Sequence, residues 1–430
     1  MVSKNICIFE DDRSDNLLPL VYLRPVFELR CGMSSLREKI EQAYPESKVH
    51  IVCRGYLSDT VKEQVSAASV NDAQALGEED CLFLNGRILA RSDLSKNIPL
   101  NGPEEVGVQG ETVVYARLKS ETVKKVLNDS GEDLTRLSAG ILKGIPETKE
   151  IDVLLISYPW DLVKHNAEAI KDDYQALGGG RVEGFLDERV AIYGDKSQLY
   201  VGEGARIVEA GVVLNLEEGP IYIDKKAKIR AFSIIDGPAF VGESAIIDGA
   251  KLREGCSIGK VCRIGGELEE SILQAYSNKH HDGFLGHAYV GEWVNLGAIV
   301  TNSDLKNNYG EVKLYVKGEL INSGEIKVGC FIADHTKVGI GTFLNTGTVI
   351  GVAANVFGGG LPPKYLPSFS WGGGKEFVEH DPEKAIANAK KIMARRKVEQ
   401  SPAEAALLRK VYEMTAEERE AAGIGNAKNL

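Results

Sequence analysis

Three of the seven histidines in the chain, His280, His281 and His287, lie within one short stretch, residues 277–308. The stretch is rich in asparagine and interrupts a long array of Gly-containing repeats. An unperturbed imidazole has a pKa of about 6.5, so a neutral histidine can accept a proton near physiological pH. Transfer of an acyl group from a thioester to an amine needs such a base. The stretch is therefore predicted to be an acyl-transfer site built on a repetitive scaffold.

The scaffold is predicted from aliphatic residues that recur every six positions. One run is Ile223, Ile229, Ile235, Val241 and Ile247, and a second is Ile326, Ile332, Val338, Leu344, Ile350 and Val356. Small residues follow the first four members of the first run by four positions, namely Ala227, Ser233, Ala239 and Ala245. A period of six suits neither an α-helix nor a hairpin, but three such sides close one triangular coil. Residues 186–360 are predicted to form a left-handed parallel β-helix of hexapeptide repeats, from which residues 302–309 leave as a loop.

The first 180 residues alternate short apolar runs with helical patterns. The apolar runs are residues 6–9, 49–53, 81–84, 112–116 and 153–156. This alternation predicts a Rossmann-like α/β domain with a mainly parallel sheet, whose ligands bind beyond the carboxyl ends of the strands. Glu10 and Asp11 directly follow the first run and are therefore candidate substrate-binding residues.

Four further side chains of this domain are candidates for binding phosphate or metal. Arg24 and Arg30 flank an apolar loop before a predicted helix, and guanidinium groups suit phosphate oxygens. Pairing with nearby carboxylates is the alternative for both arginines. Asp161 and Asn166 follow the last apolar run and could hold a metal cation that carries the phosphates of a substrate. The alternative for Asp161 is that it only starts a helix.

Residues 361–430 are predicted to form a helical tail. Asp381-Pro382 is a helix start signal, and the run from Ser401 to Glu404 has the pattern of a capping box. A basic cluster falls late in the first helix of the tail and comprises Lys390, Lys391, Arg395, Arg396 and Lys397. It could meet the phosphates of a CoA thioester, or it could be a solvated face that complements the helix dipole.

The composition limits the partners of the 430-residue chain. A net charge of −11 argues against binding to nucleic acid or to an anionic membrane. The seven cysteines are scattered without a C-x-x-C pair, which is typical of reduced thiols in a cytoplasmic protein. The N-terminus lacks a signal-peptide pattern, and no apolar stretch approaches the about 18 residues of a membrane span. A cytoplasmic protein is therefore predicted.

The histidine-containing stretch resembles a known family. Residues 285–291 and 294–298 read L-G-H-A-Y-V-G and V-N-L-G-A, which is similar to the acetyltransferase part of the bifunctional enzymes that make UDP-N-acetylglucosamine. The resemblance implies that His281 is the general base, or His280 if the alignment slips by one residue. It also implies a homotrimer and acetyl-CoA or another acyl-CoA as co-substrate.

Residues 302–309, which follow this motif, depart from the family's pattern. Asn295, Asn302 and Asp304 are candidates for binding sugar hydroxyls. Asparagine is also favoured at turns, so a structural role is the alternative for the two asparagines. The departure indicates that the acyl acceptor differs from the usual amino sugar.

The first domain resembles a divergent group of sugar nucleotidyltransferases that are fused to β-helix acyltransferase-like domains. The resemblance rests on residues 9–30 and on the P-W-D-L sequence at 159–162. It implies sugar-1-phosphate nucleotidyl transfer from an NTP with Mg²⁺, coupled to acyl transfer in nucleotide-sugar synthesis. The usual Gly-rich loop after the first strand is missing, and Arg87 stands in the place of the family's metal-binding aspartate. A non-catalytic module that binds a nucleotide sugar or organises a trimer, and a purely structural scaffold, are the alternatives.

Overall fold

The computed structural model describes residues 4–67, 69–129, 148–208, 210–374 and 376–425 of the chain. The chain divides into two compact units. The first comprises Met1–Leu17, Leu23–Leu29 and Ser34–Ser157, and the second comprises Leu18–Tyr22, Arg30–Met33 and Tyr158–Leu430. The predicted division into residues 1–180, 186–360 and 361–430 stays a prediction.

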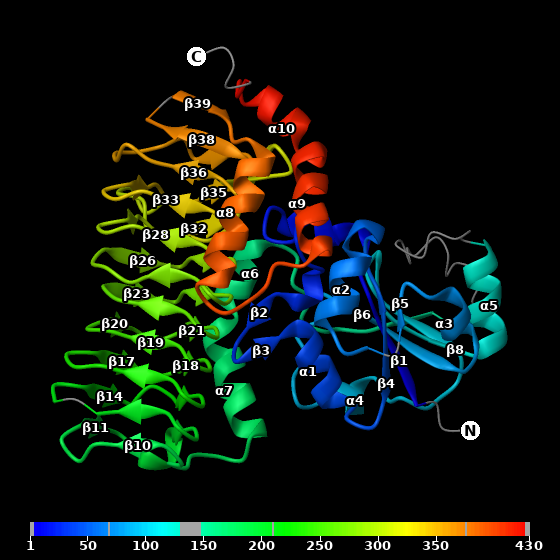
Figure 1. Cartoon of the computed structure of the whole chain (residues 1–430). Coiled ribbons are helices and arrows are strands. Elements are labelled where there is room, and N and C mark those ends of the chain that lie inside the picture. The colour runs from blue at the N-terminus through cyan, green and yellow to red at the C-terminus, as the bar shows by residue number, and fades with distance from the viewer. Residues whose placement is uncertain (1–3, 68, 130–147, 209, 375, 426–430) are drawn as a thin grey trace. The chain divides into compact units, whose positions relative to one another are not determined.

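The first unit is built on a seven-stranded sheet with the order β5-β4-β1-β6-β8-β7-β9 (Figure 1). The strands are β1 (Asn5–Phe9), β4 (Lys48–Val52), β5 (Ser69–Val70), β6 (Cys81–Asn85), β7 (Glu105–Gln109), β8 (Thr112–Leu118) and β9 (Thr148–Glu150). The helices of this unit are α1 (Leu36–Ala43), α2 (Ser58–Gln64), α3 (Ala73–Gly77), α4 (Leu94–Asn97) and α5 (Ser120–Asp129). β1 runs parallel to β4 and β6, whereas β8 is antiparallel to β6 and β7. The predicted Rossmann-like α/β class is confirmed.

The central strand of this sheet is apolar on both faces because layers of structure cover both. Ile6, Cys7, Ile8 and Phe9 are all fully buried, as is typical of a parallel strand inside an α/β domain. One predicted strand is wrong. Residues 153–156 do not form a strand, and Leu155 makes only an isolated bridge to Ile88.

The second unit contains a parallel β-helix with three sheets (Figure 1). Its first sheet comprises β10 (Phe185–Leu186), β13 (Arg206–Ile207), β16 (Lys228–Ile229), β19 (Ile246–Ile247), β22 (Arg263–Ile264), β25 (Asn278–Lys279), β28 (Asn295–Leu296), β33 (Lys337–Val338), β36 (Asn355–Val356), β38 (Ser370–Gly373) and β39 (Glu376–Glu379). Its second sheet comprises β11 (Ala191–Tyr193), β14 (Val213–Asn215), β17 (Ile234–Asp236), β20 (Lys251–Leu252), β23 (Glu267–Glu269) and β26 (Phe284–Gly286), and β29 (Thr301–Asn302) pairs separately with β34 (Phe343–Leu344). Its third sheet comprises β12 (Leu199–Val201), β15 (Ile221–Ile223), β18 (Ala239–Val241), β21 (Cys256–Ile258), β24 (Ile272–Leu273), β27 (Tyr289–Val290), β32 (Cys330–Ile332), β35 (Thr348–Ile350) and β37 (Tyr365–Leu366).

The six-residue repeat fills the interior of the β-helix, as predicted. All five members of the first run, from Ile223 to Ile247, are fully buried in one continuous core, and so are the small residues that follow them. The second run is buried from Ile332 onward. Ile326 is the exception, because it lies outside the strands ahead of β32 and is 49% exposed.

An insertion leaves the β-helix between β29 and β32. It contains the antiparallel pair β30 (Lys313–Val316) and β31 (Glu319–Asn322), so the predicted loop is a longer, hairpin-bearing segment. An antiparallel bridge between Leu305 and Lys327 closes its base. The stack resumes directly afterwards, because Tyr289 of β27 pairs with Phe331 of β32.

Helices cover parts of the β-helix and follow it. α6 (Pro159–Lys164) and α7 (Asn166–Ala176) contact β27, β18 and β21 of the third sheet. β37 and β38 continue two sheets past residue 360, so the array ends later than the predicted limit of the β-helix at residue 360. The tail then forms α8 (Pro382–Ala394), α9 (Pro402–Met414) and α10 (Ala416–Ala421). In the described part of the chain, every helix is too short or too polar to cross a membrane.

Replacing Ile247 with Ala is expected to lower the free energy of unfolding by about 2–5 kcal/mol, because the deletion leaves a cavity in the core of the β-helix. The matched control is Ile326→Ala, a half-exposed member of the same sequence period. Its effect should stay within about 0.5 kcal/mol. Denaturant unfolding followed by circular dichroism measures both, and equal losses would contradict the assignment of the core.

Candidate functional site

The two predicted catalytic histidines lie together in the turn between β25 and β26. Their ring centroids are 5.2 Å apart at an interplanar angle of 68°. The His281 side chain is exposed, whereas His280 is half-buried with Nε2 3.8 Å from Oδ2 of Asp248. Burial lowers the pKa of His280 against the opposing effect of Asp248. A neutral imidazole is therefore present at this corner at neutral pH.

A buried lysine fixes the backbone of the same turn. Lys279 is fully buried and stands in register with the core residue Ile264, at a position where the repeat elsewhere has an aliphatic side chain. Its ammonium group donates a hydrogen bond to the carbonyl oxygen of His281. Burial lowers the pKa of Lys279 to about 8. The sequence carried this signal as a charged residue at an inward position, but the coil register was needed to recognise it.

A row of polar and cationic side chains lies on the outer face of the first sheet. Arg263 of β22 pairs in register with Asn278, which pairs with Asn295. The Nδ2 atom of Asn278 donates to Oδ1 of Asn295 at 3.2 Å, and the guanidinium of Arg396 donates to Oδ1 of Asn278 at 2.8 Å. Burial and the positive charges of Arg396 and Arg230 lower the pKa of Arg263. An anion bound here would relieve this repulsion between guanidinium groups.

The other two predicted sugar ligands make contacts within the β-helix. Asn302 is 2% exposed; it accepts a hydrogen bond from the backbone N–H of Gly286 at 2.8 Å and donates to the carbonyls of Gly286 at 2.9 Å and Ser303 at 3.2 Å. Asp304 lies 2.8 Å from Nδ1 of His287 through its Oδ2 atom. The polar atoms of Asn302 therefore hold two coils together, and sugar binding by this residue stays a prediction.

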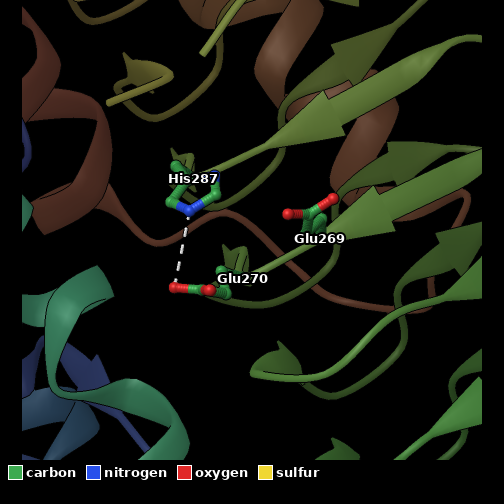
Figure 2. Close-up of side chains that lie close together, drawn as sticks. All are labelled: Glu269, Glu270 and His287. Atoms are coloured by element: carbon green, nitrogen blue, oxygen red, sulfur yellow. Dashed lines mark ion pairs between the residues drawn. The ribbon is translucent and has the colours of Figure 1, made fainter. Parts of the chain in front are cut away.

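His287 lies between two carboxylates at a corner of the β-helix, with a backbone φ of +48°. Its Nε2 atom is 3.5 Å from Oε2 of Glu270 (Figure 2), and its other ring nitrogen, Nδ1, is the one beside Asp304. Burial would lower the pKa of His287, but the hydrogen bond to Asp304 and the negative charges of Asp304 and Glu270 outweigh burial and raise it to about 9. A cationic imidazole at neutral pH is a poor general base, so His287 differs in chemistry from the His280 corner.

In the first unit, Glu10 organises the loops after β1 and β4. Its side chain is almost fully buried and accepts hydrogen bonds from the backbone of Val26 at 2.8 Å and of Arg54 at 3.0 Å. The guanidinium of Arg54 binds the same carboxylate at 2.9 and 3.0 Å. The same guanidinium also donates to the carbonyl of Arg24 at 3.1 Å. Glu10 is thus held in a network that shapes the carboxyl edge of the sheet.

Asp11 forms a bidentate ion pair with a buried arginine. Nε and NH2 of Arg87 lie 2.8 and 2.7 Å from the two carboxylate oxygens of Asp11, and Arg87 is 1% exposed. Asn85 donates a further hydrogen bond to Asp11 at 2.8 Å. Burial would raise the pKa of Asp11, but Arg87 outweighs burial and holds the pKa below its usual value.

The two predicted phosphate-binding arginines fall in different units. Arg30 places its guanidinium 5.3 Å from the ring centroid of Phe240 and donates to the carbonyl of Met33. Its backbone N–H donates to Gln274 at 3.0 Å. A guanidinium stacked on an aromatic ring in this way stabilises the packing against β18. Neither unit by itself brings Arg24 and Arg30 together.

The predicted metal ligands Asp161 and Asn166 both accept hydrogen bonds from the backbone. Asp161 accepts a hydrogen bond from the backbone N–H of Tyr158 at 2.9 Å and so caps α6. Asn166 is fully buried, accepts from Gly32 at 2.6 Å and donates to the carbonyl of Gly255 at 2.8 Å. The amide of Asn166 is thus engaged in hydrogen bonds inside the protein, and Mg²⁺ binding by this pair stays a prediction.

Comparison with known proteins agrees with the resemblance stated from the sequence. Residues 6–182 match the family model described as sugar nucleotidyl transferase. This part of the chain is a divergent relative of that family. The bifunctional sugar-1-phosphate nucleotidylyltransferase/acetyltransferase of Sulfurisphaera tokodaii is 35% identical over 95 residues, which cover 22% of this chain and 24% of that protein.

Further relatives are also described as bifunctional. The bifunctional protein GlmU of an Acidovorax species is 32% identical over 160 residues, which cover 35% of this chain and 31% of that protein. The chain therefore spans about a quarter to a third of the curated relatives that it matches. A solved UDP-N-acetylglucosamine acyltransferase is 15% identical, with a TM-score of 0.27, over 55% of this chain and 89% of that chain. The predicted resemblance to nucleotidyltransferases with an acetyltransferase part is confirmed.

Replacing Arg87 with Met is expected to destabilise the first unit by about 3–5 kcal/mol, because the carboxylate of Asp11 loses its buried partner. The matched control is Arg13→Met, whose half-exposed guanidinium lies 3.8 Å from Glu111 and should contribute about 0–1 kcal/mol. Because the folded-state pKa of Asp11 is lowered, the stabilisation is present above its unfolded pKa of about 3.9 and is lost as the pH falls through the folded value.

Denaturant unfolding of both variants between pH 7 and pH 3 measures this effect. The difference between wild type and Arg87→Met should shrink as the pH falls. A difference that stays constant across this range would show that the pairing of Asp11 with Arg87 does not account for the loss.

Proposed function

We propose that the chain is a sugar-phosphate transferase that joins a sugar-1-phosphate nucleotidyltransferase domain to an acyl-CoA-dependent acyltransferase on the β-helix. The observation that carries the proposal is the corner at His280 and His281, where neutral imidazole lies near a row of guanidinium and amide side chains. Acceptor, acyl donor and base are the three requirements of acyl transfer, and this corner offers a place for each. Nucleotide-sugar synthesis is the process that both halves would serve.

The acyl-transfer step uses the exposed imidazole of His281 as general base. The amine of the acceptor attacks the thioester carbonyl, and Nε2 or Nδ1 of His281 takes the proton that the amine loses. The C–S bond then breaks, and the proton passes to the departing CoA sulfur. His280 is the second candidate for the base. The hydrogen bond from Lys279 to the carbonyl of His281 holds the turn in place during this step.

The cationic row supports an acyl-CoA co-substrate. Arg263 and Arg396 provide guanidinium groups that suit phosphate oxygens. Asn278 and Asn295 offer amide groups on the same outer face, and Asn295 is exposed. We assign the guanidinium groups to the phosphates of CoA and Asn295 to a hydroxyl of the sugar. Because Arg396 belongs to the basic cluster of the tail, this assignment favours phosphate binding by that cluster over a solvated face that only complements the helix dipole.

The first unit is proposed to transfer a nucleotidyl group to a sugar 1-phosphate. The family match supports this role, and Arg24 and Glu10 lie on the loop that follows β1 or contacts it. Mg²⁺ is proposed to enter with the NTP phosphates. A non-catalytic module that binds a nucleotide sugar is the second candidate. It is favoured by the ion pairs that hold Glu10 and Asp11.

A cytoplasmic homotrimer is the proposed assembly. Exposed apolar side chains follow one another on successive coils near a corner of the β-helix, and a repeated apolar edge suits contact with further copies of the chain. They are Ile299 at 54%, Ile340 at 72%, Phe343 at 49% and Phe357 at 38% exposure. Such contacts would cover these side chains from water.

Replacing His281 with Ala is expected to lower the rate of acyl transfer about 10²- to 10⁴-fold, the contribution typical of a positioned general base. The measurement is release of free thiol from acetyl-CoA in the presence of amino-sugar phosphates. His380→Gln is the matched control, because this histidine lies after β39 and binds the carbonyl of Ala353. Thiol release at the wild-type rate from folded His281→Ala protein would remove His281 as the base.

Incubating the protein with an NTP, Mg²⁺ and a panel of sugar 1-phosphates is expected to release pyrophosphate. Reactions without sugar phosphate are the control for simple NTP hydrolysis. If every NTP and sugar pair fails to turn over with Mg²⁺ or Mn²⁺, nucleotidyl transfer is wrong. Equilibrium binding of a nucleotide sugar under those conditions would then support the non-catalytic module.

A further inference from the structure

Glu269, Glu270 and His287 form a cluster of side chains at the end of β23 (Figure 2). One ligand atom from each of the three side chains lies within 4.8 Å of the others. His287 is 6% exposed, and the two glutamates are partly buried. The cluster therefore combines a nearly buried imidazole with two carboxylates that remain reachable from solvent.

The separation of the ligand atoms fits metal coordination better than a direct hydrogen bond. The distance from Nε2 of His287 to Oε2 of Glu270 is 3.5 Å, beyond the usual 2.7–3.2 Å of an N–H···O bond. Two ligands that each lie about 2.1 Å from one tetrahedral ion are about 3.4 Å apart. An ion between these atoms could bind both with only small movements of the side chains.

A carboxylate already orients the imidazole for this role. Nδ1 of His287 lies 2.8 Å from Oδ2 of Asp304, which fixes the ring and turns Nε2 toward the glutamates. Metal-binding histidines usually donate their second N–H to such a carboxylate. Gly286 makes room for this approach, since a Cβ there would lie 2.6 Å from Oδ2 of Asp304.

We propose that Glu269, Glu270 and His287 bind a divalent transition-metal ion, with Asp304 as the residue that positions His287. Imidazole with two carboxylates is a ligand set for Zn²⁺ and similar ions, whereas Mg²⁺ and Ca²⁺ prefer oxygen ligands alone. The site is thus distinct from the proposed Mg²⁺–NTP complex, and it does not depend on acyl transfer.

Lys327 is the group that the ion would displace. Its Nζ atom lies 3.1 Å from Oε1 of Glu269, and its side chain is 46% exposed. An exposed ion pair of this kind contributes little, so a lysine on a long side chain can swing into solvent when an ion binds. Binding would also replace the proton on Nε2 of His287.

The site would stabilise the base of the insertion. Asp304 and Lys327 lie at its two ends, where Leu305 and Lys327 form the closing bridge. The backbone N–H of Gly329 donates to the carbonyl of His287 at 2.9 Å, and that of Val328 donates to the carbonyl of Asp304 at 2.8 Å. An ion on His287 therefore couples the insertion to β23 and β26.

The test uses the full chain, stripped of metal with a chelator and then titrated with Zn²⁺ by calorimetry, and with Co²⁺ by visible absorption. We expect one Zn²⁺ per chain, a rise in the unfolding temperature with Zn²⁺ but not with Mg²⁺, and Co²⁺ bands typical of nitrogen and oxygen ligands. Glu270→Gln and His287→Ala should each abolish this binding. Asp304→Asn should weaken it about 10- to 100-fold, as expected for an outer partner of a ligand.

Glu267→Gln is the matched control, because Glu267 lies on the same strand and pairs with Arg253 instead. It should bind Zn²⁺ like the wild type. If His287→Ala fails to fold, the isosteric Glu270→Gln decides alone. Absence of Zn²⁺ binding by the wild type, or equal binding by wild type and folded Glu270→Gln, would overturn the proposal.

Discussion

Parallel backbone pairing between successive coils is the constraint on which the second unit depends. A single coil cannot bury its own apolar side chains, so each coil is stable only against its neighbours. Every inward position must therefore carry a side chain that packs in one continuous core, as the residues from Ile223 to Leu366 do. Chemistry is left to the outward positions and to the corners, where residues such as His287 and His335 adopt positive φ.

Lys279 departs from this rule, because a charged side chain stands at an inward position of the coil. A buried ammonium group is destabilising unless hydrogen bonds satisfy it, and here the carbonyl of His281 accepts one. The β-helix thus replaces an aliphatic contact with a polar one in the coil that carries the proposed general base. Local departures from the folding pattern concentrate at functional sites, which makes this coil stand out among its neighbours.

The sequence was sufficient for the fold because both signals are local. A six-residue period and alternating apolar runs each reflect burial that the chain repeats every few residues. Both patterns can therefore be recognised in the sequence without knowledge of the contacts in the fold. Ile326 shows the limit, since it keeps the period but lies outside the strands and is half exposed. Residues 153–156 show the same limit in the first unit, where apolar composition did not produce a strand.

The candidate sites were predictable only in part, because the residues that surround the predicted side chains come from other coils and from the tail. His280 and His281 could be chosen from motif and pKa, but Asp248 and Arg263 lie on preceding coils whose lengths vary. Arg396 comes from the tail and reaches Asn278 across 118 residues. The burial of Asn302 was not predictable, because an exposed sugar ligand and a buried bridge between coils can both be asparagine.

Buried charge decides what the first unit can do. A carboxylate that is bound at both oxygens by a guanidinium has its charge neutralised and its position fixed by that arginine. Arg87 is 1% exposed, so loss of this pairing would leave a buried charge unpaired. Arg87 thus holds Asp11 in the loop after β1, and Arg54 similarly holds Glu10. The two carboxylates that directly follow β1 neutralise arginines and so fix the loops at this edge of the sheet.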